Sequence, residues 1–207
     1  MKHLPPQIKK GLWLGLLGVV IFALTLPLTR LAVGTPAAPQ LSGLFVSTGR
    51  ATVAALLSII YLWLTRAPWP TRANLPALAV VMLGVVFGFP MLSSIAMRQV
   101  EAVHASVMLG VLPLATALVG AWLHRQRPSA GFWACAGLGT ALVVAFALLR
   151  SGHAGWTLAW ADTLLLAAMA CAAVGYGMGS LLSQRLPAEQ VICWALVLGL
   201  PLNLPLA

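Results

Sequence analysis

The sequence predicts an all-α fold, a polytopic bundle of about seven transmembrane helices, and three observations lead to this prediction. First, 61% of the 207 residues are hydrophobic and 7% are charged, whereas ordinary globular domains carry about 25% charged residues. Second, the apolar residues fall in runs close to the roughly 20 residues that a helix needs to cross a bilayer. Third, these runs do not alternate apolar with polar residues, as the strands of a membrane barrel do.

Charged residues and turns rich in proline and glycine separate the apolar runs. The turns include residues 34–39 and 67–70, where proline and glycine favour a reversal of the chain. Each run is long enough to span the membrane. In chain order, the expected spans are residues 11–29, 41–64, 73–97, 102–123, 128–149, 163–184 and 190–207.

Basic residues dominate the charge, and their positions orient the bundle. The formal net charge of +9 would also suit a protein that neutralises nucleic-acid phosphates. Cytoplasmic loops of membrane proteins keep an excess of Lys and Arg, however, and a cytoplasmic N-terminus satisfies this rule. Eight basic residues then lie inside and three outside: Lys2, Lys9, Lys10, Arg66, Arg72, Arg125, Arg127 and Arg185 against Arg30, Arg98 and Arg150. The charge therefore indicates a multi-pass protein of the cell inner membrane, in contact with the lipid bilayer and without a nucleic-acid partner.

Residues suited to metal binding or catalysis are few. The three cysteines are isolated within apolar runs, without the spacing of a metal site or a disulfide framework. A membrane enzyme acting on lipid would need clustered His, Asp or Ser at one interface, and only His153 near Ser151 hints at such a cluster. The sequence therefore predicts no metal, no cofactor and no enzymatic activity, and the short loops place the function inside the bundle.

Arg50 is the most informative single residue. It lies about nine positions into the 41–64 span, which at about 1.5 Å per residue places it near the bilayer midplane. A cation at that depth costs several kcal/mol, so we expect it to face the bundle interior. Carbonyls, hydroxyls such as those of Thr25 or Thr48, or an anionic group of a substrate could satisfy it. The other interpretation is structural, an arginine that ties helices together.

Three prolines interrupt the expected spans and mark a candidate substrate pathway. Pro27 cannot donate a hydrogen bond to the carbonyl of Ala23, which frees that acceptor and bends the helix. Pro90 and Pro113 have the same effect in later spans. Broken helices often line transporter sites, but such kinks also merely shape many bundles, and both interpretations stay open. The pathway candidates from these segments are Thr25, Pro27, Ser93, Ser94 and Pro113.

Two further side chains complete the candidate set. His104 lies about one turn into the 102–123 span and could titrate near neutral pH, although a plain interfacial histidine is the alternative. Tyr176 places a phenol at mid-depth, where it needs a hydrogen-bond partner or a substrate. No carboxylate lies at mid-depth in an expected span, so the sequence does not predict proton coupling through a buried acid.

The order of these features resembles the EamA-domain members of the drug/metabolite transporter superfamily. FALTLPLTRLAV (residues 22–33) is similar to the end of that family's first helix, and GRATVAALL (49–57) to its Arg-bearing second helix. Residues 103–143, VHASVMLGVLPLATALVGAWLHRQRPSAGFWACAGLGTALV, resemble the helix with a central proline, the charged turn and the glycine-bearing fifth helix. MACAAVGYGMGSLLSQRLPAEQ (169–190) looks like the start of a second repeat.

The resemblance implies ten helices in two five-helix repeats of inverted topology. Residues 1–150 would form the first EamA-like repeat, and residues 151–207 would form two helices of an incomplete second one. Arg127 and Pro128 match the turn after the fourth helix, but Gln126 stands where the family usually has a glutamate. Any ion pair made by that acid is therefore absent here.

The function that the resemblance implies is a permease. It would move an unknown small metabolite or drug-like molecule across the bacterial inner membrane by alternating access. Because three helices of the expected ten are missing, a truncated fragment that inserts but does not transport is the alternative, and a homodimer in which another copy completes the chain is a third interpretation. A multipass membrane enzyme is the least favoured hypothesis.

Overall fold

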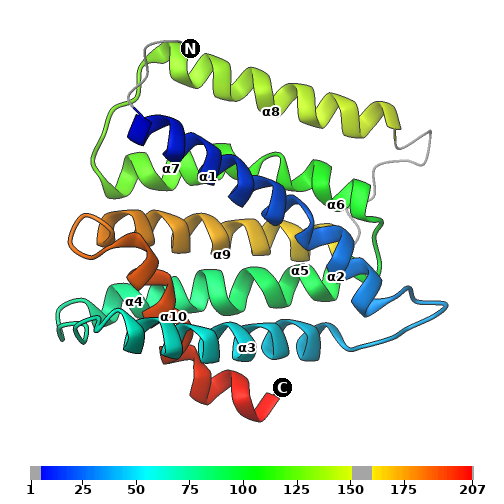
Figure 1. Cartoon of the computed structure of the whole chain (residues 1–207). Helices are drawn as coiled ribbons and strands as arrows, with labels where there is room; N and C mark the ends of the chain where they lie inside the picture. Colours follow the sequence, from blue (N-terminus) through cyan, green and yellow to red (C-terminus); the bar gives the residue numbers. More distant parts are fainter. Residues whose placement is uncertain (1–5, 151–159, 207) are drawn as a thin grey trace.

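The computed structural model describes residues 6–150 and 160–206, and the regular structure of these residues is helical throughout (Figure 1). Two of the elements are not α-helices: η1 is a short π-helix and η2 a single 3-10 turn. The elements are α1 Pro6–Ala23, α2 Thr25–Val33, α3 Gly43–Leu64, α4 Leu75–Val81, η1 Met82–Gly88, α5 Phe89–Met97, α6 Ala102–Leu109, α7 Leu112–Leu123, α8 Ala130–Arg150, α9 Trp160–Leu182, α10 Ala188–Asn203 and η2 Leu204–Leu206.

Six helical segments of the described chain are long and apolar enough to cross a membrane, which confirms the polytopic helical bundle. The 21-residue α8 takes the place of the remaining expected span. Of that helix, Ala130–Leu142 is counted as a shorter apolar stretch. The six segments are Gly11–Val33, Gly43–Leu64, Leu75–Met97, Ala102–Leu123, Trp160–Leu182 and Ala188–Leu206.

Three of the spans are interrupted, each shortly before a proline. The first span breaks at Leu24, between α1 and α2, ahead of Pro27. The third widens into η1 ahead of Pro90, which has no N–H to close the helical hydrogen bond one turn back. The fourth breaks between α6 and α7, ahead of Pro113. Proline thus shapes the bundle where the sequence predicts it.

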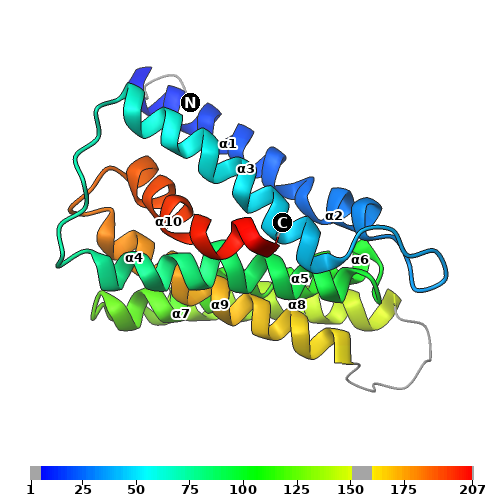
Figure 2. The same ribbon diagram turned by 90° about the horizontal axis from the view of Figure 1, so that it is seen from below.

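Most basic residues lie in segments at one end of the bundle. The start of α1 and the α3–α4, α7–α8 and α9–α10 connections lie at one end, on the left of Figure 1, and Figure 2 shows the same arrangement from below. We call this the basic end, because its segments contain most of the basic residues: Lys9, Lys10, Arg66, Arg72, Arg125, Arg127 and Arg185. The α2–α3 and α5–α6 connections lie at the other end. Which end faces the cytoplasm stays a prediction.

Exposed aromatic rings accompany the basic end. Trp63 and Trp122 lie in the last turns of α3 and α7, Trp69 lies in the α3–α4 connection, and all three are largely exposed. Trp69 also packs on Trp194 of α10, with 4.8 Å between the ring centroids. Tryptophan favours the boundary between hydrocarbon and water, so this end of the bundle has the composition of a membrane interface.

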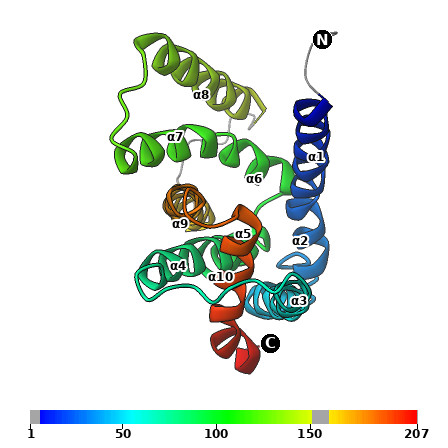
Figure 3. The ribbon, with the colours of Figure 1, turned by 60° about the vertical axis from the view of Figure 1, so that its left-hand side comes forward.

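α9 lies in the middle of the bundle and packs against α4, η1 and α5 on one side and α7 on the other (Figure 3). η1 and α9 approach each other closely. A Cβ atom on Gly84 would lie 2.5 Å from the carbonyl oxygen of Cys171, and one on Gly175 would lie 2.6 Å from the side chain of Val85. Glycine is therefore required at this crossing. The outer helices α1 and α8 lie at the edge of the bundle (Figure 3).

Candidate functional site

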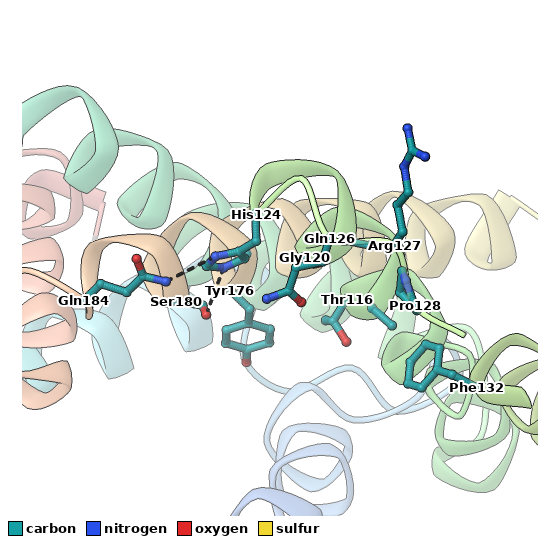
Figure 4. Close-up of a pocket in the computed structure, with 13 residues that line it drawn as sticks. Thr116, Gly120, His124, Gln126, Arg127, Pro128, Phe132, Tyr176, Ser180 and Gln184 are labelled. Atoms are coloured by element: carbon teal, nitrogen blue, oxygen red, sulfur yellow. Dashed lines mark hydrogen bonds between the residues drawn. The ribbon is translucent and has the colours of Figure 1, made fainter. Parts of the chain in front are cut away.

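A cavity of about 970 Å³ lies between α7 and α9 at the basic end of the bundle (Figure 4). α7 supplies its lining from Thr116 to the end of the helix, and α9 supplies the facing wall from Tyr176 onward. Figure 4 shows His124, Ser180 and Gln184 together on one side of the cavity, and Arg127 and Phe132 toward the other. The lining residues with polar side chains are Thr116, His124, Gln126, Arg127, Tyr176, Ser180 and Gln184.

The imidazole of His124, directly after α7, joins the two walls. Its Nδ1 lies 3.2 Å from Nε2 of Gln184, and its Nε2 lies 3.4 Å from the hydroxyl of Ser180 (Figure 4). These two contacts link the end of α7 to α9 and its continuation.

Tyr176 lines the cavity from α9. Arg50 on α3 is exposed and is not among the lining residues, in contrast to the expectation that it faces the bundle interior. Arg50 makes no hydrogen bond and no ion pair with another residue that the structure describes. The Thr48 hydroxyl, one of the groups considered as partners of Arg50, lies 2.8 Å from the carbonyl oxygen of Leu44 and 3.0 Å from that of Leu206.

Polar contacts tie the helices together at the end opposite the cavity. His104 on α6 lies 2.7 Å from a carboxylate oxygen of Asp162, in the first turn of α9. Arg30 on α2 donates to the carbonyl of Met97 at the end of α5. Arg98 donates to the carbonyl of Leu41, at 2.8 Å. A histidine near a bilayer surface ordinarily forms hydrogen bonds with water. The sequence therefore does not predict the pairing of His104 with Asp162.

The remaining sequence candidates lie elsewhere, and the cavity does not include them. Ser93 and Ser94 are buried on α5, and the Ser93 hydroxyl donates to the carbonyl of Phe89 at 2.6 Å. Thr25 begins α2, where Pro27 borders a shallow hollow against α6. Pro113 lies in the first turn of α7, ahead of the cavity wall. Of the candidates, Tyr176 is the one found among the described residues that line the cavity.

Sequence reasoning missed three residues that shape the cavity: His124, Ser180 and Gln184. Each lies near the end of a span, where polar residues are ordinary and carry no local signal. A four-residue spacing on one helix was the available clue, since Tyr176, Ser180 and Gln184 repeat along one face of α9 and its continuation. The spacing does not reveal which helix faces them.

Six apolar helical segments among the described residues, with a cavity bordered by polar side chains at one end, define a polytopic helical membrane protein. The model of the EamA-like transporter family matches residues 9–149. The chain belongs to this family, which confirms the resemblance seen in its motifs and agrees with a transporter rather than an enzyme.

The chain is also similar to an uncharacterized transporter, YdeK of Bacillus subtilis (strain 168). The two are 42% identical over 193 residues, which is 93% of this chain and 64% of the relative. The chain thus spans less than two thirds of the length of that protein. No solved structure matches the chain.

Proposed function

We propose that the chain forms the translocating part of a permease of the drug/metabolite transporter type, which moves a small polar molecule across the inner membrane by alternating access. Residues 1–150 serve as the first repeat and residues 151–207 as part of the second, with the N-terminus in the cytoplasm. The observation that carries this proposal is the asymmetry of the bundle: the cavity between α7 and α9 lies at the basic end, and the pairing of His104 with Asp162 lies at the other.

The same two parts of the chain meet at both ends, as alternating access requires. At the basic end α7 and α9 form the two walls of the cavity. At the other end α6, which continues into α7, is paired with the start of α9 through His104 and Asp162. Rocking one repeat against the other would close the cavity and separate this pair. In the proposed cycle, this arrangement represents the state open toward the basic end.

A reversible cross-link tests this movement without knowledge of the substrate. In a background in which Cys135, Cys171 and Cys193 are replaced by Ala, His104→Cys and Asp162→Cys form a disulfide on oxidation, while Ser180→Cys reports on the cavity. We expect a membrane-impermeant maleimide to label position 180 only from the basic end when the disulfide is closed. After reduction, labelling from the opposite side should appear.

The control chain carries His104→Cys and Ser180→Cys without Asp162→Cys, and oxidation should not change its labelling. Equal labelling of the locked chain from both sides of the membrane would contradict a closed opposite end. Labelling of the reduced chain from the basic end alone would contradict alternating access by this chain.

Transport itself is tested in vesicles. Proteoliposomes that contain the 207-residue chain, preloaded with a library of small metabolites and drug-like compounds, should release at least one compound faster than protein-free vesicles. The disulfide between positions 104 and 162 should stop that release, and reduction should restore it. Release at the protein-free rate for the whole library would refute transport by this chain.

A further inference from the structure

A groove of about 690 Å³ lies at the basic end, between the last turns of α3, the α3–α4 connection and α10. None of its lining residues lines the cavity between α7 and α9. The side chains of Ile59, Trp63 and Leu64 on its α3 wall are exposed. Because these apolar side chains belong to a membrane span, the groove opens toward the surrounding lipid.

The groove is apolar along its length and charged at one end. Ile59 and Leu62 of α3 and Val197 of α10 form its apolar part. Arg66 lines it beyond the end of α3, about two helical turns further along the chain than Ile59. No carboxylate is among the described residues that line it, and none of the described residues forms an ion pair with Arg66. An apolar slot thus ends at a cation without a counter-charge.

The backbone at the end of α3 holds Arg66 in this position. Its φ of 49° lies in the left-handed region that glycine ordinarily occupies after a helix. The N–H of Arg66 donates to the carbonyl of Trp63 at 3.1 Å, and the N–H of Ala67 donates to that of Leu62 at 3.0 Å. These two hydrogen bonds form a Schellman motif. All four residues line the groove, so the turn that ends the helix also builds the charged end of the groove.

Tryptophan rings accompany this charged end. Trp63, Trp69 and Trp194 all line the groove, and the rings of Trp69 and Trp194 lie 4.8 Å apart between centroids. Tryptophan favours the depth of the lipid head groups. The planar guanidinium of arginine matches the geometry of a phosphate group. The groove therefore offers a phosphate site at head-group depth and a hydrocarbon surface further into the membrane.

We propose that this groove binds one anionic phospholipid, with its phosphate paired with Arg66 and an acyl chain along Ile59, Leu62 and Val197. Basic residues at a membrane surface attract anionic lipids, and a phospholipid joins the anion to a hydrocarbon chain in the order that the groove requires. A zwitterionic lipid supplies the same chains without a net negative charge. The inference does not depend on the proposed transport function.

Lipid-induced stabilisation of the purified chain in a neutral detergent tests the proposal, because a ligand raises the melting temperature of the state that binds it. The probes separate the head group from the chains: dioleoyl phosphatidylglycerol, dioleoyl phosphatidylcholine, dioleoylglycerol and glycerol 3-phosphate. We expect phosphatidylglycerol to raise the melting temperature most. The zwitterionic lipid, the uncharged lipid and the head group without chains should each have little effect.

Variants of Arg66 assign the effect to the groove. Arg66→Gln should weaken the apparent affinity for phosphatidylglycerol about fivefold to tenfold, the loss expected for one basic residue at an anionic surface. Arg66→Lys should lose less, because the charge is retained without the planar fork. The melting temperature of each variant without lipid reports separately on folding.

Arg125→Gln is the matched control. Arg125 follows α7 with a φ of 51°, and its N–H donates to the carbonyl of Trp122 at 3.3 Å, so it has the same place in a helix end as Arg66. Neither Arg125 nor Trp122 lines the groove. Arg125→Gln should therefore bind phosphatidylglycerol like the parent chain, although it removes the same charge from the same end of the bundle.

A phosphatidylglycerol with a photoreactive acyl chain gives a second measurement on the parent chain, without any substitution. Its cross-links should fall on residues 59–66 and 194–197. Cross-links confined to other helices would overturn the proposal. So would equal stabilisation by phosphatidylcholine, stabilisation by glycerol 3-phosphate alone, an absence of stabilisation by any probe, or equal losses in Arg66→Gln and Arg125→Gln.

Discussion

Ser42 shows at the scale of single residues how the chain fixes the start of α3. Its backbone is extended, with φ −67° and ψ 144°, and its hydroxyl oxygen accepts a hydrogen bond from the N–H of Phe45 at 3.1 Å. This contact satisfies one of the N–H groups that the first turn of a helix leaves without a partner. The helix that carries Arg50 thus begins at a defined residue.

Removing this cap should destabilise the protein measurably. We expect Ser42→Ala to lower the free energy of unfolding by about 0.5 to 2 kcal/mol, measured by denaturant titration in mixed micelles. Ser106→Ala is the matched control, because the Ser106 hydroxyl donates only within its own helix, to the carbonyl of Ala102. That change should remain within about 0.5 kcal/mol. Equal effects of the two substitutions would refute a capping role for Ser42.

Individual residues also divide by whether their local sequence reveals them. Arg50 and Tyr176 are exceptional within apolar runs, so the sequence alone predicts both as site candidates. His124 and Gln184 lie at the ends of spans, where the same residue types are common. A polar residue stands out in the sequence only within an apolar span, where the lipid makes its burial costly. Sequence reasoning therefore singles out the mid-span candidates and passes over the polar residues at the ends of spans.

At the scale of helices, glycine spacing has two different meanings in this chain. Gly11 and Gly15 on α1 have the same four-residue spacing as Gly84 and Gly88, yet a Cβ atom on either α1 glycine would meet nothing within 4 Å. At Gly84 a Cβ would meet the backbone of α9, which no side-chain rotation can relieve. The spacing indicates that close packing is sterically allowed, and only the neighbouring helix makes it necessary.

Substitutions at these glycines should therefore differ in effect. Gly84→Leu should destabilise the protein by about 1 to 3 kcal/mol or more, because η1 and α9 must move apart to admit the side chain. Gly15→Leu should leave stability unchanged or raise it slightly, since leucine is the better helix former and faces open space. Unfolding in mixed micelles measures both. If Gly15→Leu destabilised the protein as strongly as Gly84→Leu, the crossing would not be the cause.

At the scale of the whole molecule, the connections predict how the protein sits in the membrane. Most basic residues belong to segments at one end of the bundle, and positively charged loops stay on the cytoplasmic side. The cavity between α7 and α9 lies at this same end. We therefore predict that the cavity faces the cytoplasm.

Side-specific labelling of cells tests that orientation. In the chain without native cysteines, Ala37→Cys marks the α2–α3 connection and Thr71→Cys marks the α3–α4 connection, and both positions are exposed. A membrane-impermeant maleimide applied to intact spheroplasts should label position 37 at once and position 71 only after permeabilisation. The reverse pattern would place the N-terminus outside and would turn the cavity toward the periplasm.

Membrane residence, the positions of the spans and the proline-linked breaks follow from the sequence itself, because each depends on the length and hydropathy of a local segment. The charge asymmetry between the two ends follows for the same reason. The motifs in their order likewise led to the EamA-like family, which the family match confirms.

Only the tertiary structure shows which helix faces meet. The pairing of His104 with Asp162, the crossing of Gly84 and Gly175, and the cavity closed by His124 all depend on how helices are rotated and crossed. Helices that are apolar all round carry little periodic signal for a buried face, since lipid and protein interior are both apolar to them. The sequence predicted about seven spans, and packing around α9 decided that α7 and α9 face each other across the cavity.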